Sequence, residues 1–205
     1  MGKQWWQFIV FSLVLTAIIL SSVIFGGYSS LHRSEKRINI TKGLFLDACR
    51  NKLDLVQKLI DSLNDIEPEV ELTGLKHTRL EAKQVLDKAF SNAAPLDDEI
   101  THKLEISQSA LTEELKKTLL NVDKLQDKNK KQQFTTIKQQ LYSAQDKVTL
   151  EKIRYNVEVS YFNRRSRAFP LFFIARLFEF DKSKYYELGQ NYFLSAEKVY
   201  KNKSE

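Results

Sequence analysis

A long uncharged stretch near the start of the chain limits what it can fold into. No charged residue occurs from Gln4 to Leu31, and the segment FIVFSLVLTAIILSSVIF at residues 8–25 is almost entirely apolar. As an α-helix this segment would rise about 27 Å, close to the roughly 30 Å thickness of a bilayer's hydrocarbon core. We therefore predict a transmembrane helix over residues 5–28, preceded by a short tail at residues 1–4.

The alternative to a retained span is a cleaved signal peptide, whose apolar region is usually about 7 to 15 residues long and is followed closely by small residues. The apolar run here is longer, and its best cleavage site, Gly27-Tyr28-Ser29, comes late. Trp5, Trp6 and Tyr28 flank the run, at positions where amphipathic rings favour the lipid headgroup layer. These flanking rings favour a span that stays in the membrane.

Charges close to the two ends of the span predict its orientation. Only Lys3 and the terminal amine precede it, whereas four basic residues follow it closely, namely Arg33, Lys36, Arg37 and Lys42. Basic residues collect on the cytoplasmic side of membrane helices. We expect a single-pass cell membrane protein with its N-terminus outside and its C-terminal domain in the cytoplasm.

Composition separates the remaining fold classes. Only six Gly and three Pro occur in 205 residues, so the tight turns of a many-stranded β fold are missing, while Lys, Glu, Gln, Leu and Asp are abundant, as in long helices. The net charge of +6 comes from interleaved basic and acidic residues rather than from a basic stripe, so we expect no nucleic-acid partner. Cys49 is the only cysteine, which excludes an intrachain disulfide and suits a reducing compartment.

Apolar residues at helical spacing predict two helices directly after the span. The first covers residues 34–66 and can continue from the span itself; Pro68 and Gly74 then interrupt the helical pattern. The second covers about residues 75–92. The apolar positions of the two helices are Ile38, Phe45, Ala48, Leu55, Leu59, Leu63 and Ile66, followed by Leu75, Leu86, Ala89 and Phe90.

Two further helices follow Pro95. Asp97, Asp98 and Glu99 suit the start of the third, because acidic side chains interact favourably with the positive end of a helix dipole. A polar gap, QDKNKKQQ at residues 126–133, separates it from the fourth, whose apolar pattern Glu151 interrupts. The apolar positions are Ile100, Leu104, Leu111, Leu115, Val122 and Leu125, then Phe134, Ile137, Leu141, Ala144, Val148, Tyr155, Val159 and Phe162.

Four amphipathic helices joined by short breaks predict an all-α fold, in which the transmembrane helix leads into an elongated antiparallel up-and-down four-helix bundle. The stripes are expected to form the bundle core and not a cofactor site. We place a juxtamembrane link at residues 29–33, the bundle at residues 34–190 and a C-terminal extension at residues 191–205.

A repeated pair of residues marks the fourth helix. Tyr155-Asn156 and Phe162-Asn163 are seven residues apart, so both aromatic rings fall on the buried stripe and both asparagines at its edge. We expect a packing motif in which the asparagine amides bond backbone of a neighbouring helix end or loop. The alternative, a ligand site formed by Tyr155 and the asparagines, has no cluster of titratable residues beside it.

The chain resembles the LemA family of bacterial membrane-anchored helical proteins. The resemblance rests on the N-terminal membrane helix, NKLDLVQKLIDSL at residues 51–63, RYN and FN in the fourth helix, and AFPLFFIARLFEF followed by YYEL. Within these motifs the family pattern matches Phe169, Pro170 and Phe178; Gln57 replaces a common proline, and the tail is longer than usual. The resemblance implies a four-helix up-and-down bundle with a cytoplasmic domain, and it supplies no chemistry.

Three arginines and an apolar segment follow the second asparagine. Arg164, Arg165 and Arg167 would lie at the carboxyl end of the fourth helix, which returns to the membrane side in an up-and-down bundle. They are candidates for contact with lipid headgroups. The segment LFFIARLFEF after Pro170 either caps the bundle or touches the membrane interface, and both alternatives stay open.

No pattern of catalytic residues is visible. Glu113 and Glu114 are consecutive, so they do not face each other on a helix, and the three histidines, His32, His77 and His102, are too scattered to predict a metal site. We expect no enzyme activity and no cofactor, but a membrane-tethered interaction or scaffold protein, with lipid around its N-terminal helix and a protein partner that the sequence does not identify. The alternative is a sensor or signal-input bundle. The oligomeric state stays open.

Overall fold

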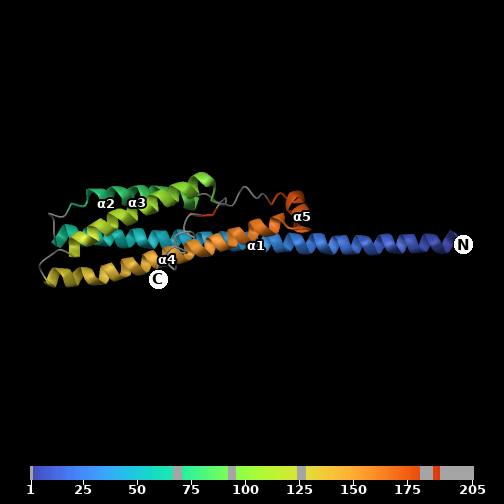
Figure 1. Ribbon diagram of the computed structural model, residues 1–205, viewed down its shortest axis with the longest axis horizontal. Coiled ribbons are helices and arrows are strands. Elements are labelled where there is room, and N and C mark those ends of the chain that lie inside the picture. The colour runs from blue at the N-terminus through green and yellow to red at the C-terminus, as the bar shows by residue number, and fades with distance from the viewer. Residues whose placement is uncertain (1, 67–70, 92–95, 124–127, 181–186, 190–205) are drawn as a thin grey trace, which may run out of the picture.

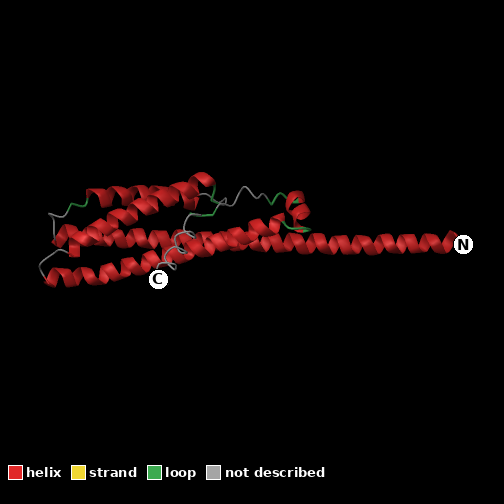
Figure 2. Cartoon of the chain, in the orientation of Figure 1, coloured by secondary structure: helices red, strands yellow, loops and turns green. Residues whose placement is uncertain are grey.

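The computed structural model describes residues 2–66, 71–91, 96–123, 128–180 and 187–189 (Figure 1). These residues form five helices and no strand (Figure 2). The helices are α1 (Gly2–Ile66), α2 (Thr73–Ser91), α3 (Asp98–Asp123), α4 (Lys128–Arg167) and α5 (Leu171–Leu177). The predicted all-α class is confirmed.

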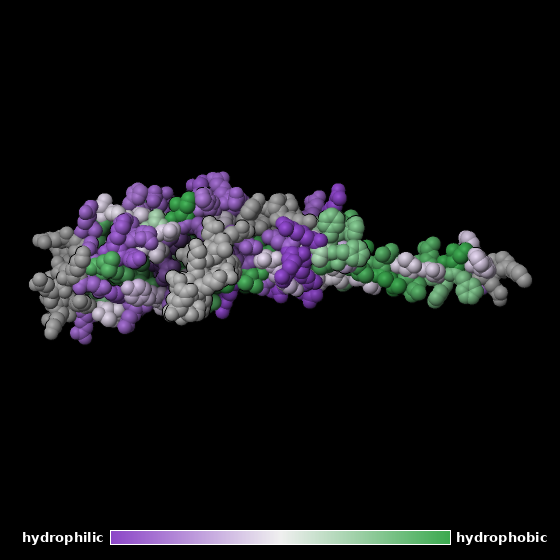
Figure 3. All heavy atoms as spheres, viewed as in Figure 1, coloured by the Kyte–Doolittle hydropathy of each residue, from purple (hydrophilic) through white to green (hydrophobic). Residues whose placement is uncertain are grey.

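Helix α1 is a single uninterrupted helix of 65 residues, about 100 Å long at 1.5 Å per residue. Its first part extends alone away from the rest of the molecule, and its second part lies within the packed body (Figure 1). Residues 5–26, all of them exposed, are called the bare part of α1, and the packed remainder of the molecule is called the body. The bare part is hydrophobic and the body largely hydrophilic on the face shown in Figure 3. It is long and apolar enough to cross a membrane. Residues 29–33, expected as a link, are helical, as are residues 2–4 of the expected tail.

The body forms by pairwise packing of the long helices. Helix α4 lies along the second part of α1, α2 packs against α3, and α1 also contacts α2, while α3 and α4 touch less extensively. One continuous core of buried apolar residues joins them. Every described residue predicted for the apolar stripes lies in this core or packs against it. The side chains of Ile66 and Leu125 lie outside the description.

The structure differs from the sequence prediction at two places in α4. This helix begins at Lys128, within the predicted polar gap, because Lys and Gln are good helix formers even without an apolar stripe. Glu151, expected to interrupt the stripe, is buried within it and pairs with Arg154 at 2.9 Å. The predicted breaks at Pro68 and Pro95 and the extension at residues 191–205 lie outside the described residues. Gly74, expected to interrupt the helical pattern, lies instead in the first turn of α2.

Helix α5 is short and lies where α1 leaves the body (Figure 1). Helix α4 ends at Arg167, and Pro170 caps the start of α5 after a cis Phe169–Pro170 peptide bond. Behind α5 the backbone turns at Glu179, which has a φ of 55°. This turn directs Phe180 back towards α1 and α4, where its ring packs beside Tyr28 and Phe162.

Candidate functional site

The rings of the repeated motif lie inside the body. Tyr155 and Phe162 are fully buried in the core, two turns apart on α4. The Tyr155 hydroxyl has no hydrogen-bond partner among the described residues, and burial raises the pKa of this phenol above its usual range. Because it stays protonated and enclosed, Tyr155 acts here as a packing residue.

Asn156 holds a segment that is distant in the sequence. Its Nδ2 donates to the carbonyl oxygen of Leu188 at 2.6 Å, and the Leu188 N–H donates to its Oδ1 at 2.8 Å. A side-chain amide can thus satisfy both polar groups of one buried backbone residue, which would otherwise cost free energy. Leu188 is fully buried. The partly buried Asn163 accepts a hydrogen bond at its backbone oxygen from Ser166 Oγ, so the two asparagines have different surroundings.

The segment at residues 187–189 lies over an ion pair between α3 and α4. Lys152 pairs with Glu105 at 2.6 Å. At Gly189, where φ is +62°, an added Cβ would lie 1.9 Å from Glu105 Oε1 and 2.5 Å from Lys152 Nζ. Only glycine combines this backbone angle with such a close approach. The hydrogen bonds of Asn156 and the small size of Gly189 together allow residues 187–189 to pack against the ion pair between α3 and α4.

A buried lysine connects α1 to α3. Lys52 is fully buried, and its Nζ donates to Thr112 Oγ1 at 2.8 Å, while the Thr112 hydroxyl donates to the Gln108 carbonyl at 2.7 Å. Burial lowers the pKa of Lys52 to about 8. Lys52 lies seven residues from both Phe45 and Leu59, so the helical periodicity alone could have identified it as a core position.

The single cysteine lies one turn before this lysine. Cys49 is fully buried, and burial raises the pKa of its thiol to about 12, against the smaller opposing effect of the Lys52 and Lys152 ammonium groups. A thiol needs its thiolate form and access to solvent to act as a nucleophile. Cys49 is therefore a small core residue, and Lys52 beside it forms a polar contact between helices.

Helix α5 packs closely on α1 at a glycine. A Cβ at Gly27 would lie 2.2 Å from Ile174 Cδ1 and 3.0 Å from Leu171 Cδ2, so the absence of a side chain there permits the contact. One residue later, the Tyr28 ring lies 4.9 Å from that of Phe178. These contacts dock α5 against α1 immediately after the apolar run.

The three arginines of α4 have unequal surroundings. Arg165 is partly buried and donates to the Tyr161 hydroxyl at 2.8 Å, whereas Arg164 and Arg167 are exposed. Arg37 of α1 also lies against the Tyr161 ring and pairs with Glu158 at 3.2 Å. Arg164 and Arg167 are thus available for external anions, and Arg165 is engaged within the body.

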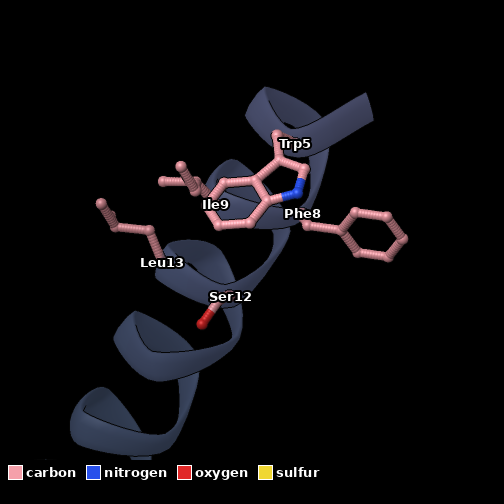
Figure 4. A pocket seen from close by; sticks show the side chains of 5 residues that line it. All are labelled: Trp5, Phe8, Ile9, Ser12 and Leu13. Atoms are coloured by element: carbon pink, nitrogen blue, oxygen red, sulfur yellow. The ribbon is translucent and has the colours of Figure 1, made fainter. Parts of the chain in front are cut away.

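The bare part of α1 carries one shallow hollow. It is lined by Trp5, Phe8, Ile9, Ser12 and Leu13, all from consecutive turns of this helix (Figure 4). A gap between side chains of a single apolar helix suits a lipid chain better than a polar ligand. The three histidines are exposed, and the part of the chain that the structure describes contains no group of metal-binding side chains.

Replacing Asn156 with alanine should release the segment at residues 187–189. Leu188 would lose both hydrogen bonds while its backbone stays enclosed, which costs about 1–3 kcal/mol for each buried polar group left unpaired. Hydrogen exchange of the Leu188 amide, measured on the full chain in mild detergent, should accelerate at least about tenfold. Asn51→Ala, at an exposed position of α1, is the control, and equal protection in both variants would contradict the assignment.

Replacing Lys52 with methionine should stabilise the protein at neutral pH. The folded protein releases the Lys52 proton near pH 8, whereas the unfolded chain keeps it to about pH 10.5, so the stability of the parent rises through this window. Lys52→Met should be more stable by about 1–3 kcal/mol at pH 7, because Thr112 keeps its own acceptor. Denaturant unfolding should show that the difference in unfolding free energy between Lys52→Met and the parent is smaller at pH 9.5 than at pH 7. An unchanged difference, or one equal to that of the exposed Lys58→Met, would contradict the burial argument.

Comparison with known proteins identifies the family. A model of the LemA family matches residues 46–199 of the chain, three quarters of its length and all of α2 to α5. No curated protein and no solved structure matches the chain. The family match includes the Asn156 motif, the α5 segment and the residues around Leu188. Since it extends over far more than half of the sequence, the chain belongs to the LemA family.

Proposed function

We propose that this LemA-family chain is a membrane-tethered interaction protein without catalytic activity. The tethering part of the proposal rests on α1, a single helix that joins a run of exposed apolar residues to the buried core. All fifteen large apolar side chains between Trp5 and Phe25 are at least 39% exposed, yet Leu31, on the same helix, is fully buried. A helix that is apolar on all sides over this length fits the bilayer core. One rigid element would thus join the membrane to the body.

The arrangement of the body supports an antiparallel four-helix bundle made of α1 to α4. Arg37 of α1 pairs with Glu158 of α4, while Cys49, farther along α1, lies near Lys152, earlier on α4. Residue numbers therefore rise along one helix as they fall along the other. Such a bundle is an elongated rod whose long outer faces are available for partners.

The outer face of α4 supports an interaction role. Leu150, Ile153 and Val157 are each about half exposed and are spaced three and four residues apart, on the side of α4 opposite Tyr155 and Phe162. Single exposed apolar residues are ordinary, but a stripe of them on one helix favours contact with another protein. We name these three residues the α4 stripe and assign it to a protein partner.

Affinity capture of the full chain from membranes in mild detergent tests this role. The expected result is a partner recovered in stoichiometric amount, whose recovery falls at least about tenfold when the α4 stripe is replaced by glutamine, the loss that about 1.4 kcal/mol of contact energy produces. The matched control replaces Leu80, Ile106 and Leu120 by glutamine, which are equally exposed apolar residues on α2 and α3.

Two outcomes would contradict the proposal. One is the absence of any stoichiometric partner for the parent chain. The other is a partner that both sets of substitutions affect equally, because the α4 stripe would then have no special role. Far-UV circular dichroism and thermal unfolding of the variants separate a lost contact from a lost fold.

The body is proposed to lie in the cytoplasm, because basic residues follow the span. Arg33, Lys36 and Arg37 are exposed just beyond it, while Lys42 is largely buried, which lowers the pKa of its ammonium. With Gly2→Cys, an impermeant maleimide should label intact cells, and with Asn51→Cys it should label only after lysis. Buried Cys49 should stay unlabelled at neutral pH. The reverse pattern would overturn the orientation.

The uninterrupted α1 also favours a second role, as a signal-input module. A small shift of a rigid helix at the membrane would be transmitted along its whole length into the body. A small ligand that binds the full chain in equimolar amount and changes hydrogen exchange at both ends of α1 would favour this role over that of an interaction protein.

A further inference from the structure

The contacts between α5 and α1 show where α5 lies along the length of α1. Gly27, where Ile174 packs, comes two residues after Phe25, the end of the apolar run. Leu31, one turn later, is the first fully buried large side chain of α1. If residues 8–25 fill the hydrocarbon core, α5 lies where that core gives way to the headgroup layer.

Helix α5 has a buried face and an exposed apolar face. Ile174 and Ala175 are buried against the body. Phe173 and Leu177, four residues apart and thus neighbours on the helix surface, are 61% and 67% exposed, and Phe169 just before the helix is 84% exposed. The Phe169 and Phe173 rings contact each other edge to face, with centroids 6.1 Å apart. These three residues form one apolar patch, here named the α5 patch.

The α5 patch adjoins the bare part of α1. Figure 3 shows hydrophobic surface running from the bare helix onto the neighbouring end of the body. Hydrophilic surface follows next to it, on the side away from the bare helix. If the bare part of α1 lies in lipid, the α5 patch beside it lies against the same lipid. A protein partner would have to enter the headgroup layer to cover this patch, whereas lipid is already there.

Positive charge gathers at the same level. Residues 29–37 and 158–180 contain seven basic side chains and three acidic ones, in a chain whose net charge is +6. Among the acids, Glu158 is paired with Arg37. Arg164, Arg167 and Arg176 are exposed on α4 and α5. An apolar patch bordered by arginines is the composition of helices that lie in the interface of anionic membranes.

We propose that α5 is an interfacial membrane helix. The α5 patch enters the lipid of the leaflet from which α1 emerges, and Arg164, Arg167 and Arg176 contact the phosphates of anionic headgroups. This inference rests on the tethering by α1 proposed above. The protein then touches the membrane at two places, and the second contact fixes how the body is rotated and tilted about the span.

Depth-dependent quenching in the full chain tests the proposal. The chain carries an environment-sensitive nitrobenzoxadiazole label at a single engineered cysteine and is reconstituted into vesicles whose lipid tails are brominated. Labels at Phe173→Cys and, in a second protein, Leu177→Cys report on α5. Phe11→Cys, on the exposed part of α1, reports on the span, and Ile106→Cys, an equally exposed apolar position on α3, reports on the body.

We expect strong quenching at position 11, about half as much at positions 173 and 177, and none at position 106, because interfacial helices lie about 5–10 Å into the boundary between headgroups and acyl chains. Quenching at position 11 without quenching at 173 and 177 would overturn the role of α5 and leave the tether intact. The absence of quenching at position 11 would overturn the tether itself, so the two failures are distinguishable.

The charge of the lipid tests the arginines. With about one third anionic lipid, quenching at position 173 should rise about twofold over zwitterionic vesicles at low salt, and it should return towards the zwitterionic value at high salt. The substitutions Arg164→Gln, Arg167→Gln and Arg176→Gln together should abolish this rise. Lys58→Gln, Lys83→Gln and Lys116→Gln, at exposed positions elsewhere on the body, should leave it unchanged. A rise that survives the arginine substitutions would overturn the headgroup contact.

Discussion

The structure depends on one constraint, which is the free energy of apolar surface in water. The large apolar side chains between Trp5 and Phe25 have no protein neighbour to bury them within the described residues. Fully burying one such side chain is worth roughly 1.5–3 kcal/mol, so fifteen of them would be far more stable in lipid than in water. In the proposed tethering, this requirement sets where the membrane would end along α1, and it would place Gly27 and Leu31 close to that boundary.

Polar contacts in the body, two of them made by buried side chains and one by partly buried ones, restrict the alignments that the apolar stripes would allow. A stripe of leucines packs almost equally well after a slip of one or two helical turns, whereas a buried hydrogen bond does not. Lys52 with Thr112 joins α1 to α3, Lys152 with Glu105 joins α4 to α3, and Asn156 with Leu188 joins α4 to the distant segment. Burial lowers the pKa of Lys52 to about 8, so keeping this ammonium group charged in the core costs stability below that pH.

Much of this fold follows from sequence periodicity, because burial of one helix face leaves a pattern of three and four. The core positions Leu59, Leu111 and Phe162 are all of this kind. The buried positions of Lys52 and Glu151 do not follow from the sequence in the same way, because a charged side chain is ordinarily exposed even where its spacing matches the stripe. The close contact at Gly27 could not be predicted either, since it depends on how a seven-residue helix returns through space to α1.

The unbroken length of α1 and the position of α5 have a joint mechanical consequence. A lone transmembrane helix can rotate about its axis at little cost, because lipid surrounds it equally on all sides. Since α1 has no break between the apolar run and the core, any such rotation would swing the whole body. Helix α5 lies beside the axis of α1, packed on Gly27 by Ile174, so a contact between its apolar patch and lipid would resist rotation and tilt alike. In the proposed arrangement, the continuous helix would keep the body at a fixed angle to the span, and the α5 contact would fix its rotation. A partner docked on α4 would then meet a surface held at a constant angle to the membrane.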